Sequence, residues 1–252
     1  MSWRRATVAD DGTHHLVEGR PLYAARFRLV QTFHEPGLAP VIDDSGAYHI
    51  DVSGAPAYSA RFRQVWGFYD NRAAVEDAAG WFHIHPDGSP GYIDRHSWCG
   101  NFQEERCTVR DSDGRYFHID LAGVPLYPER HRYAGDFRDG AAVIRSSQCD
   151  LCTHIDGDGR LLHGQWFIDL DVYHKGFARA RDRRGWFHVD QHGAEAYQAR
   201  FAEVEPFYNG QAKVTTLGGE IAVIDQTGAV RLIVRTSGFP GGEKGPQEQP
   251  TR

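Results

Sequence analysis

Long apolar runs and methionine are nearly absent from this chain, which has a single methionine and no apolar stretch of about 18 residues. No apolar segment follows the first five residues, so we expect neither a secretion signal nor a membrane span. Basic residues number 28 against 34 acidic ones, and they are scattered, which disfavours nucleic acid as a partner. We therefore expect a cytoplasmic monomer with no nucleic-acid or membrane partner.

Cysteine is also scarce. Four residues, Cys99, Cys107, Cys149 and Cys152, do not make a disulfide framework in a reducing compartment, so we expect free thiols. Cys149-Asp-Leu-Cys152 near His154 has zinc-ligand spacing, but no second Cys-x-x-Cys follows, and a structural zinc site is the alternative. A nucleophile elbow, a phosphate loop, a dinucleotide fingerprint and an HExxH motif are all lacking, which disfavours ordinary hydrolase and Rossmann chemistry.

What the chain does contain is a repeat rich in glycine, with 28 Gly and 12 Pro overall. Six histidines recur at intervals of 34 to 36 residues. A glycine stands five residues after each histidine, an aromatic residue or histidine stands nine after it, and an arginine or Trp166 stands twelve after it. Such regular spacing predicts short strands joined by tight turns. The histidines are His14, His49, His83, His118, His154 and His188.

Each repeat is expected to form three short strands, for example residues 81–85, 91–98 and 106–110. A seventh, degraded copy over 222–235 has Val223 at the histidine position. The fold class predicted is all-β, a β-propeller-like closed ring of six to seven repeats of about 35 residues. The N-terminal strand would complete the last sheet and close the ring, and an open solenoid is the alternative. We expect one repeat domain over 1–236 and a disordered tail over 237–252.

The repeated pattern aromatic-Phe-His-Ile-Asp-x-x-Gly-x-Pro-x-Tyr, then Arg-Phe, Gly67-Phe68 and Ala73-Ala74-Val75, resembles the WG (KWG-type), WD-like β-repeat proteins over residues 4–235. It departs from them because the aromatic-Gly pair is displaced into aromatic-Phe-His. The chain length and histidine content are also similar to the repeat protein of toxoflavin-type azapteridine antibiotic biosynthesis. This second resemblance implies a small-molecule heterocyclic substrate.

Two hypotheses account for the histidines. In the first, they are structural and bond to the Asp two residues on, or to the Tyr or Arg of the second strand. In the second, the six rings converge on the axis of a closed ring and hold a transition metal ion, Fe, Mn, Co or Zn, while Asp51, Asp120, Asp156 and Asp190 fix their tautomers. The metal ligands would be His14, His49, His83, His118, His154 and His188.

The fifth repeat departs most from the pattern, with His163 for Tyr and Trp166 for Arg. Together with His96, His131 and Trp98, Trp166 would line a pocket for a planar heterocycle. The predicted substrate-binding residues are Tyr58, Arg61, Tyr92, Arg95, Tyr127, Arg130, His163 and Trp166. The function predicted is a metalloenzyme of small-molecule biosynthesis, of oxidoreductase or lyase type. The alternative is a non-catalytic β-propeller that binds or scaffolds a partner.

Overall fold

The computed structural model describes residues 3–235, and the tail expected over 237–252 lies outside them. Apart from one turn of 3-10 helix, η1 (Trp3–Arg5), every regular element in the described chain is a β-strand. The chain divides into two compact units, Met1–Tyr173 and His174–Arg252, which are described separately. The single domain expected over 1–236 stays a prediction. No helix of the described chain is long and apolar enough to cross a membrane.

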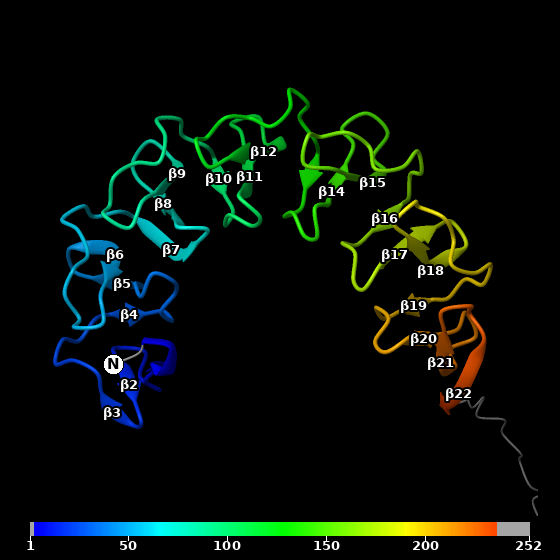
Figure 1. The fold of residues 1–252 in the computed structure, drawn as a ribbon, viewed down its shortest axis with the longest axis horizontal. Coiled ribbons are helices and arrows are strands. Elements are labelled where there is room, and N and C mark those ends of the chain that lie inside the picture. Colours follow the sequence, from blue (N-terminus) through cyan, green and yellow to red (C-terminus); the bar gives the residue numbers. More distant parts are fainter. Residues whose placement is uncertain (1–2, 236–252) are drawn as a thin grey trace, which may run out of the picture. The chain divides into compact units, whose positions relative to one another are not determined.

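The described part of unit 1 contains a succession of small antiparallel sheets, each with three strands (Figure 1). A short edge strand comes first, and a hairpin of two longer strands follows in most of them. The sheets are β1 (Thr7–Val8), β2 (His15–Val17) and β3 (Arg20–Pro21); β4 (Leu29–Val30), β5 (Ala39–Asp43) and β6 (Gly46–Ile50); β7 (Gln64–Tyr69), β8 (Arg72–Glu76) and β9 (Trp81–Ile84); β10 (Trp98–Cys99), β11 (Arg106–Arg110) and β12 (Tyr116–Asp120); β13 (Tyr133–Ala134), β14 (Ala142–Arg145) and β15 (Cys152–Ile155). Strand β16 (Asp169–Leu170) follows.

Unit 2 contains the hairpin of β17 (Phe177–Asp182) and β18 (Gly185–Asp190). It also contains a sheet of four strands in the order β19 (Glu203–Val204), β20 (Gln211–Thr215), β21 (Ile221–Asp225) and β22 (Val230–Arg235). The degraded seventh copy is therefore folded, with β21 between β20 and β22. At the N-terminus β1 pairs with β2, and a sheet shared between the two ends of the chain stays a prediction.

The second predicted strand of each repeat is wrong. In the third repeat residues 90–97 form a curled loop that touches β9 through two isolated bridges, Ile84↔Pro90 and Trp81↔His96, and Trp98 begins β10. The cause is Arg95, whose Nη1 donates to the carbonyl oxygens of Ile93 and Asp94. Successive carbonyls of an extended strand point to opposite sides, so one guanidinium nitrogen reaches both only where the chain curls.

This loop shifts the sheets relative to the sequence repeat. The strand at 106–110, expected to close the third sheet, is β11 and pairs with β12 of the next repeat. A tight turn joins them, in which Asp111 accepts hydrogen bonds from the backbone N–H groups of Asp113 and Arg115. The histidine strand is thus the last strand of its sheet rather than the first, except in the first sheet, where β2 lies between β1 and β3.

Neighbouring repeats are joined by a tyrosine that packs on the next turn glycine. Gly123 has φ +81°, and a Cβ there would lie 2.4 Å from the ring of Tyr92 in the preceding repeat. The glycine therefore allows the left-handed turn and also makes room for the ring. The same contact recurs at Gly54 with Tyr23, Gly88 with Tyr58, Gly159 with Tyr127 and Gly228 with Tyr197.

The predicted fold class is confirmed. Each sheet is too small to be stable alone, since isolated sheets of two or three short strands bury little apolar surface. Tyrosines on the glycine turns bury the faces between neighbouring sheets, and residues such as Ile84, Val109 and Ile119 are fully buried there. The chain is an all-β, β-propeller-like repeat protein.

Candidate functional site

The repeated histidines are buried and bond through both ring nitrogens. His118 Nε2 lies 2.8 Å from the carbonyl oxygen of Gly135, and its Nδ1 lies 2.5 Å from the Tyr127 hydroxyl. A carbonyl oxygen only accepts, so the imidazole donates from Nε2 and the tyrosine donates to Nδ1. The same two bonds recur at His49 with Tyr58, His83 with Tyr92 and His188 with Tyr197.

An aromatic ring that sequence reasoning missed completes each network. Phe137 packs on His118 with ring centroids 4.6 Å apart, and it stands nineteen residues later in the chain. The spacing itself was the available signal, because an aromatic residue recurs there in every repeat with a histidine. These rings are Phe33, Phe68, Phe102, Phe137, Tyr173 and Phe207.

In the first repeat the structural position belongs to His15, and its assignment to His14 is corrected. His15 Nδ1 lies 2.5 Å from the Tyr23 hydroxyl and its Nε2 lies 2.8 Å from the carbonyl oxygen of Gln31. His14 precedes β2 and bonds to Thr13 instead. The glycine spacing selected the wrong residue because this repeat is one residue shorter between histidine and tyrosine.

In the fifth repeat His163 takes over the part of the tyrosine. Its Nε2 lies 3.0 Å from Nδ1 of His154, whose Nε2 donates to the carbonyl oxygen of Asp171. The backbone N–H of Gln165 donates to Nδ1 of His163, so His163 carries its proton on Nε2. His163, predicted to bind substrate, is buried within the structural network.

Burial keeps these rings neutral. It lowers the pKa of His118 to about 4 and that of His83 to about 3, and it raises the pKa of Tyr127. A metal binds the lone pair of a neutral imidazole, and here that lone pair accepts the proton of a tyrosine. Among residues 3–235 no three His, Cys, Asp or Glu side chains are placed to hold a metal ion. The geometry of the rings therefore supports the structural hypothesis.

The aspartates two residues after the histidines do not bond to them. Asp120 accepts hydrogen bonds from the backbone N–H groups of Ala122 and Val124 and so stabilises the glycine turn. Asp51, Asp156 and Asp190 do the same in their repeats. The tyrosine hydroxyls and the backbone carbonyls, rather than these aspartates, fix the histidine tautomers.

The repeated arginines are also part of the architecture. The guanidinium carbon of Arg130 lies 3.6 Å from the centroid of Phe117, and its Nη1 bonds to the backbone carbonyls of residues 127–129. Arg61 lies over Tyr48 and Arg95 over Phe82 in the same way. Tyr58, Tyr92 and Tyr127 are buried. Most of the predicted substrate-binding residues thus hold the repeats together.

Trp166 is the exception, and it lines a pocket of about 480 Å³ together with His131. The arginine and the ring beneath it are here replaced by Trp166 and Thr153, so the stacked pair of the other repeats is lost. The structure brings together His131 and Trp166, as predicted, whereas Trp98 lines a different pocket. Cys149 is exposed in the adjoining loop, and all four thiols are free as expected.

A row of rings crosses several sheets of unit 1, in which Trp66 and Tyr133 are exposed, Trp98 and Tyr116 are half-buried and Trp81 is buried. Trp66 stacks on Trp81 with centroids 6.2 Å apart and an interplanar angle of 15°. The ring centroids of Trp98 and Tyr116 lie 6.2 Å apart, and those of Tyr116 and Tyr133 lie 5.7 Å apart. Trp66 and Trp98 line one pocket of about 230 Å³, which joins the two groups. We call these five residues the aromatic surface; the sequence analysis missed it.

The repeat does not require aromatic residues at these positions. Trp98 and Tyr133 begin the edge strands β10 and β13. The corresponding first residues of other edge strands are Leu29 in β4, Asp169 in β16 and Glu203 in β19. A leucine or a carboxylate therefore also fits this position of the fold.

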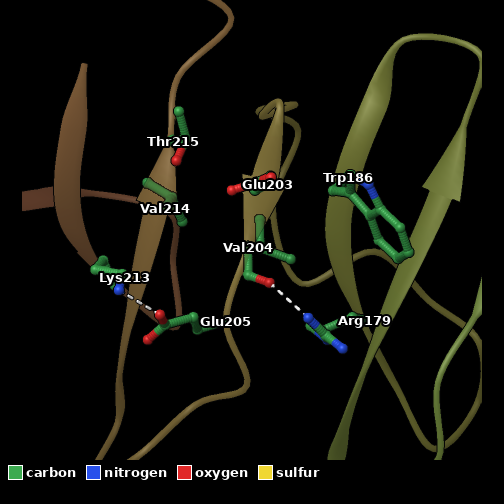
Figure 2. A pocket seen from close by; sticks show the side chains of 8 residues that line it. All are labelled: Arg179, Trp186, Glu203, Val204, Glu205, Lys213, Val214 and Thr215. Carbon is green, nitrogen blue, oxygen red and sulfur yellow. Dashed lines mark hydrogen bonds and ion pairs between the residues drawn. The ribbon is translucent and has the colours of Figure 1, made fainter. Parts of the chain in front are cut away.

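Unit 2 has a pocket of about 330 Å³ beside Trp186 (Figure 2). Three of its four charged side chains are occupied with one another or with the backbone: Arg179 donates to the carbonyl oxygen of Val204 at 3.1 Å, and Lys213 pairs with Glu205. Groups that are satisfied within the pocket gain little from a ligand. The aromatic surface of unit 1 is therefore the better candidate for a binding site.

No protein-family model and no curated protein matches the sequence, so the resemblances to WG-type and toxoflavin-pathway repeat proteins have no counterpart at that level. Solved structures do match. The computationally designed Ika8 protein has a TM-score of 0.51 at 14% identity over 90% of this chain and 82% of its own. A eukaryotic initiation factor has a TM-score of 0.51 at 9% identity, and the match covers 90% of this chain and 68% of the factor. The WD40 beta propeller domain of Doa1 has a TM-score of 0.37 at 14% identity, and the match covers 86% of this chain and 87% of that domain. At these identities the likeness concerns the fold alone.

Proposed function

We propose that this protein is a non-catalytic β-propeller-like binding module that holds a peptide segment of a partner protein on the aromatic surface. The observation that carries the proposal is the row of rings from Trp66 to Tyr133, of which Trp66 is 40% and Tyr133 49% exposed. Exposed rings at positions where the fold accepts leucine or a carboxylate are costly to solubility unless they bind something.

Large rigid rings suit this use. Tryptophan and tyrosine lose few rotamers on binding and bury large apolar areas, which is why they dominate the energetics of protein interfaces. The stacking of Trp66 on Trp81 and the tilted contact between Tyr116 and Tyr133 orient the rings before a partner arrives. Preorganised rings reduce the entropy that binding must overcome.

A metal-dependent enzyme acting on a heterocycle is supported less well. Four of the six predicted ligands, among them His83, His118 and His188, would have to give up a hydrogen bond from a buried tyrosine before they could bind an ion, and this leaves buried polar groups unpaired. The predicted substrate-binding arginines are likewise engaged with rings and backbone carbonyls. Trp166 and its pocket remain available to a ligand of the binding module.

The proposal is tested by selecting displayed random peptides on the untagged full-length protein and measuring the affinity of the selected sequences. Replacing Trp66 and Trp98 together by alanine should weaken these peptides at least tenfold, because both rings line the same pocket. The matched control is Tyr208→Ala, which removes a ring that is 57% exposed in unit 2 and should leave the affinity unchanged.

Equal binding of the selected peptides to the folded double variant would place the interaction elsewhere and contradict the proposal. A near-stoichiometric transition metal in the freshly purified, untagged protein would contradict the non-catalytic function. Circular dichroism and thermal melting of the double variant show whether it keeps the wild-type fold.

A further inference from the structure

We propose that Trp98 and Asp136 form a subsite for an arginine side chain of the partner peptide. The inference rests on the proposed function and adds the chemistry that the aromatic surface recognises. It is carried by the position of a carboxylate beside the rings, which the sequence repeat does not supply in other sheets.

The ring and the carboxylate approach the same point. A Cβ built on Gly100 would lie 3.1 Å from Cη2 of Trp98, 3.2 Å from the backbone carbonyl oxygen of Thr108 and 3.5 Å from Oδ1 of Asp136. The ring and the carboxylate therefore both lie beside Gly100. Gly100 also lines the pocket of about 230 Å³ that Trp66 and Trp98 share. The opening of this pocket therefore has an aromatic wall and an acidic neighbour.

Asp136 has no cationic partner in the described chain. No salt bridge to it is found among residues 3–235, and the hydroxyl of neighbouring Thr108 donates to the carbonyl oxygen of Gly135 instead. It is exposed to water, yet the surrounding protein raises its pKa by desolvation. A carboxylate in that environment gains from a cation, because a nearby positive charge stabilises its ionised form.

The protein already uses the same combination of groups within its own fold. Arg95 lies 3.4 Å over Phe82 and pairs with Asp77 at 3.1 Å. Arg200 lies over Phe187 at 3.6 Å and pairs with Asp182 at 2.9 Å. A planar guanidinium stacks on a ring and meets a carboxylate at its edge, which an ammonium group cannot do in one geometry.

At the aromatic surface Arg110 lies opposite Trp98 in the sheet, but no described residue forms a salt bridge with Asp136, so the inference assigns that guanidinium to the partner peptide. Arg110, on the neighbouring strand β11, lies 5.8 Å from the centroid of Tyr116, the next ring along the surface. It shows that these ring faces accept a guanidinium. The net charge of −6 further favours a basic partner.

The size of the pocket indicates a side chain rather than a cofactor. Sites for small molecules usually enclose about 300–1,000 Å³. The pocket between Trp66 and Trp98 encloses about 230 Å³, which suits one extended side chain entering from a bound peptide. The rest of the peptide would lie along Tyr116 and Tyr133.

The test uses the full-length protein and N-acetyl-arginine amide, followed through the indole N–H resonances in nuclear magnetic resonance spectra. The resonance of Trp98, assigned with Trp98→Phe, should shift in a saturable way. Asp136→Asn keeps the shape of the side chain but removes its charge, and it should weaken binding at least fivefold. Asp139→Asn, at an exposed aspartate three residues later, should leave binding unchanged.

Equal shifts with N-acetyl-citrulline amide, which has the shape without the charge, would overturn the inference, as would wild-type binding by Asp136→Asn. An equal response to N-acetyl-lysine amide would overturn the choice of a guanidinium. Failure of the arginine subsite can be told apart from failure of the proposed function. If the selected peptides lack arginine but still need Trp66 and Trp98 for binding, the subsite is refuted and the binding module is not.

Discussion

Tyrosine and histidine nine residues apart form the smallest unit on which this fold depends. The tyrosine hydroxyl satisfies Nδ1 of the buried imidazole, and the backbone seventeen residues on satisfies Nε2. The fifth repeat shows what matters in this pair, since His163 replaces the tyrosine and still presents an N–H donor to His154. A donor at this position is required, and the phenol ring itself is not.

At this scale Tyr127→Phe should lower the free energy of unfolding by about 1–3 kcal/mol, because it leaves Nδ1 of buried His118 without a donor. Urea unfolding of the full chain measures the change. The control is Tyr208→Phe, whose hydroxyl belongs to an exposed ring and whose loss should shift the midpoint little. Equal midpoints for both variants would refute the structural role assigned to the tyrosine hydroxyl.

At the scale of elements, the contact between a turn glycine and the preceding tyrosine determines how sheets pack. Each tyrosine both donates to the histidine of its own repeat and lies on the glycine turn of the next. The curled loop between them is kept in shape by an arginine that bonds to successive carbonyls. The three interactions make neighbouring repeats mutually dependent, as is typical of stacked repeat proteins.

A matched pair of glycines tests this packing. Gly114 and Gly123 have φ +77° and +81°, but a Cβ on Gly114 meets nothing within 4 Å, whereas one on Gly123 would lie 2.4 Å from the ring of Tyr92. Gly114→Ala should cost about 1–2 kcal/mol from backbone strain alone. Gly123→Ala should cost roughly 1–3 kcal/mol more, because the tyrosine must move. Chemical denaturation measures both, and equal losses would show that the ring contact is unimportant.

At the scale of the whole molecule, the buried histidines make stability depend on pH. Burial lowers the pKa of His49, His118, His154 and His188 to about 4, whereas the pKa of an exposed histidine is 6.5. Between these values the unfolded chain binds more protons than the folded one, so stability falls as the pH is lowered from 6.5 towards 4.

Each such histidine should contribute a slope of about 1.4 kcal/mol per pH unit in this window, and several together should make acid unfolding steep. Urea unfolding at pH 7.5, 6 and 5 measures the slope. His118→Gln lowers the stability overall but should reduce proton uptake on unfolding by one, which makes the slope shallower. Stability that is constant from pH 7.5 to 5 would contradict the assignment of neutral, buried rings.

The sequence by itself determined the repeat, its period, the glycine turns, the all-β class and the free thiols, because these follow from local spacing and composition. It did not determine which groups the repeated side chains bond to. Histidine at a fixed interval is compatible with a metal centre and with a structural network, and the difference lies in hydrogen bonds to residues nine and seventeen positions away.

The tertiary structure alone decided which strands pair, that His15 rather than His14 occupies the first position, and where exposed rings meet. Trp66 and Trp98 stand 32 residues apart at non-equivalent positions of their repeats, so no periodicity links them. They line one pocket although they lie in the edge strands of two different sheets, β7 and β10. Contacts between elements depend on how the sheets pack, and that packing is a property of the folded chain rather than of any local segment.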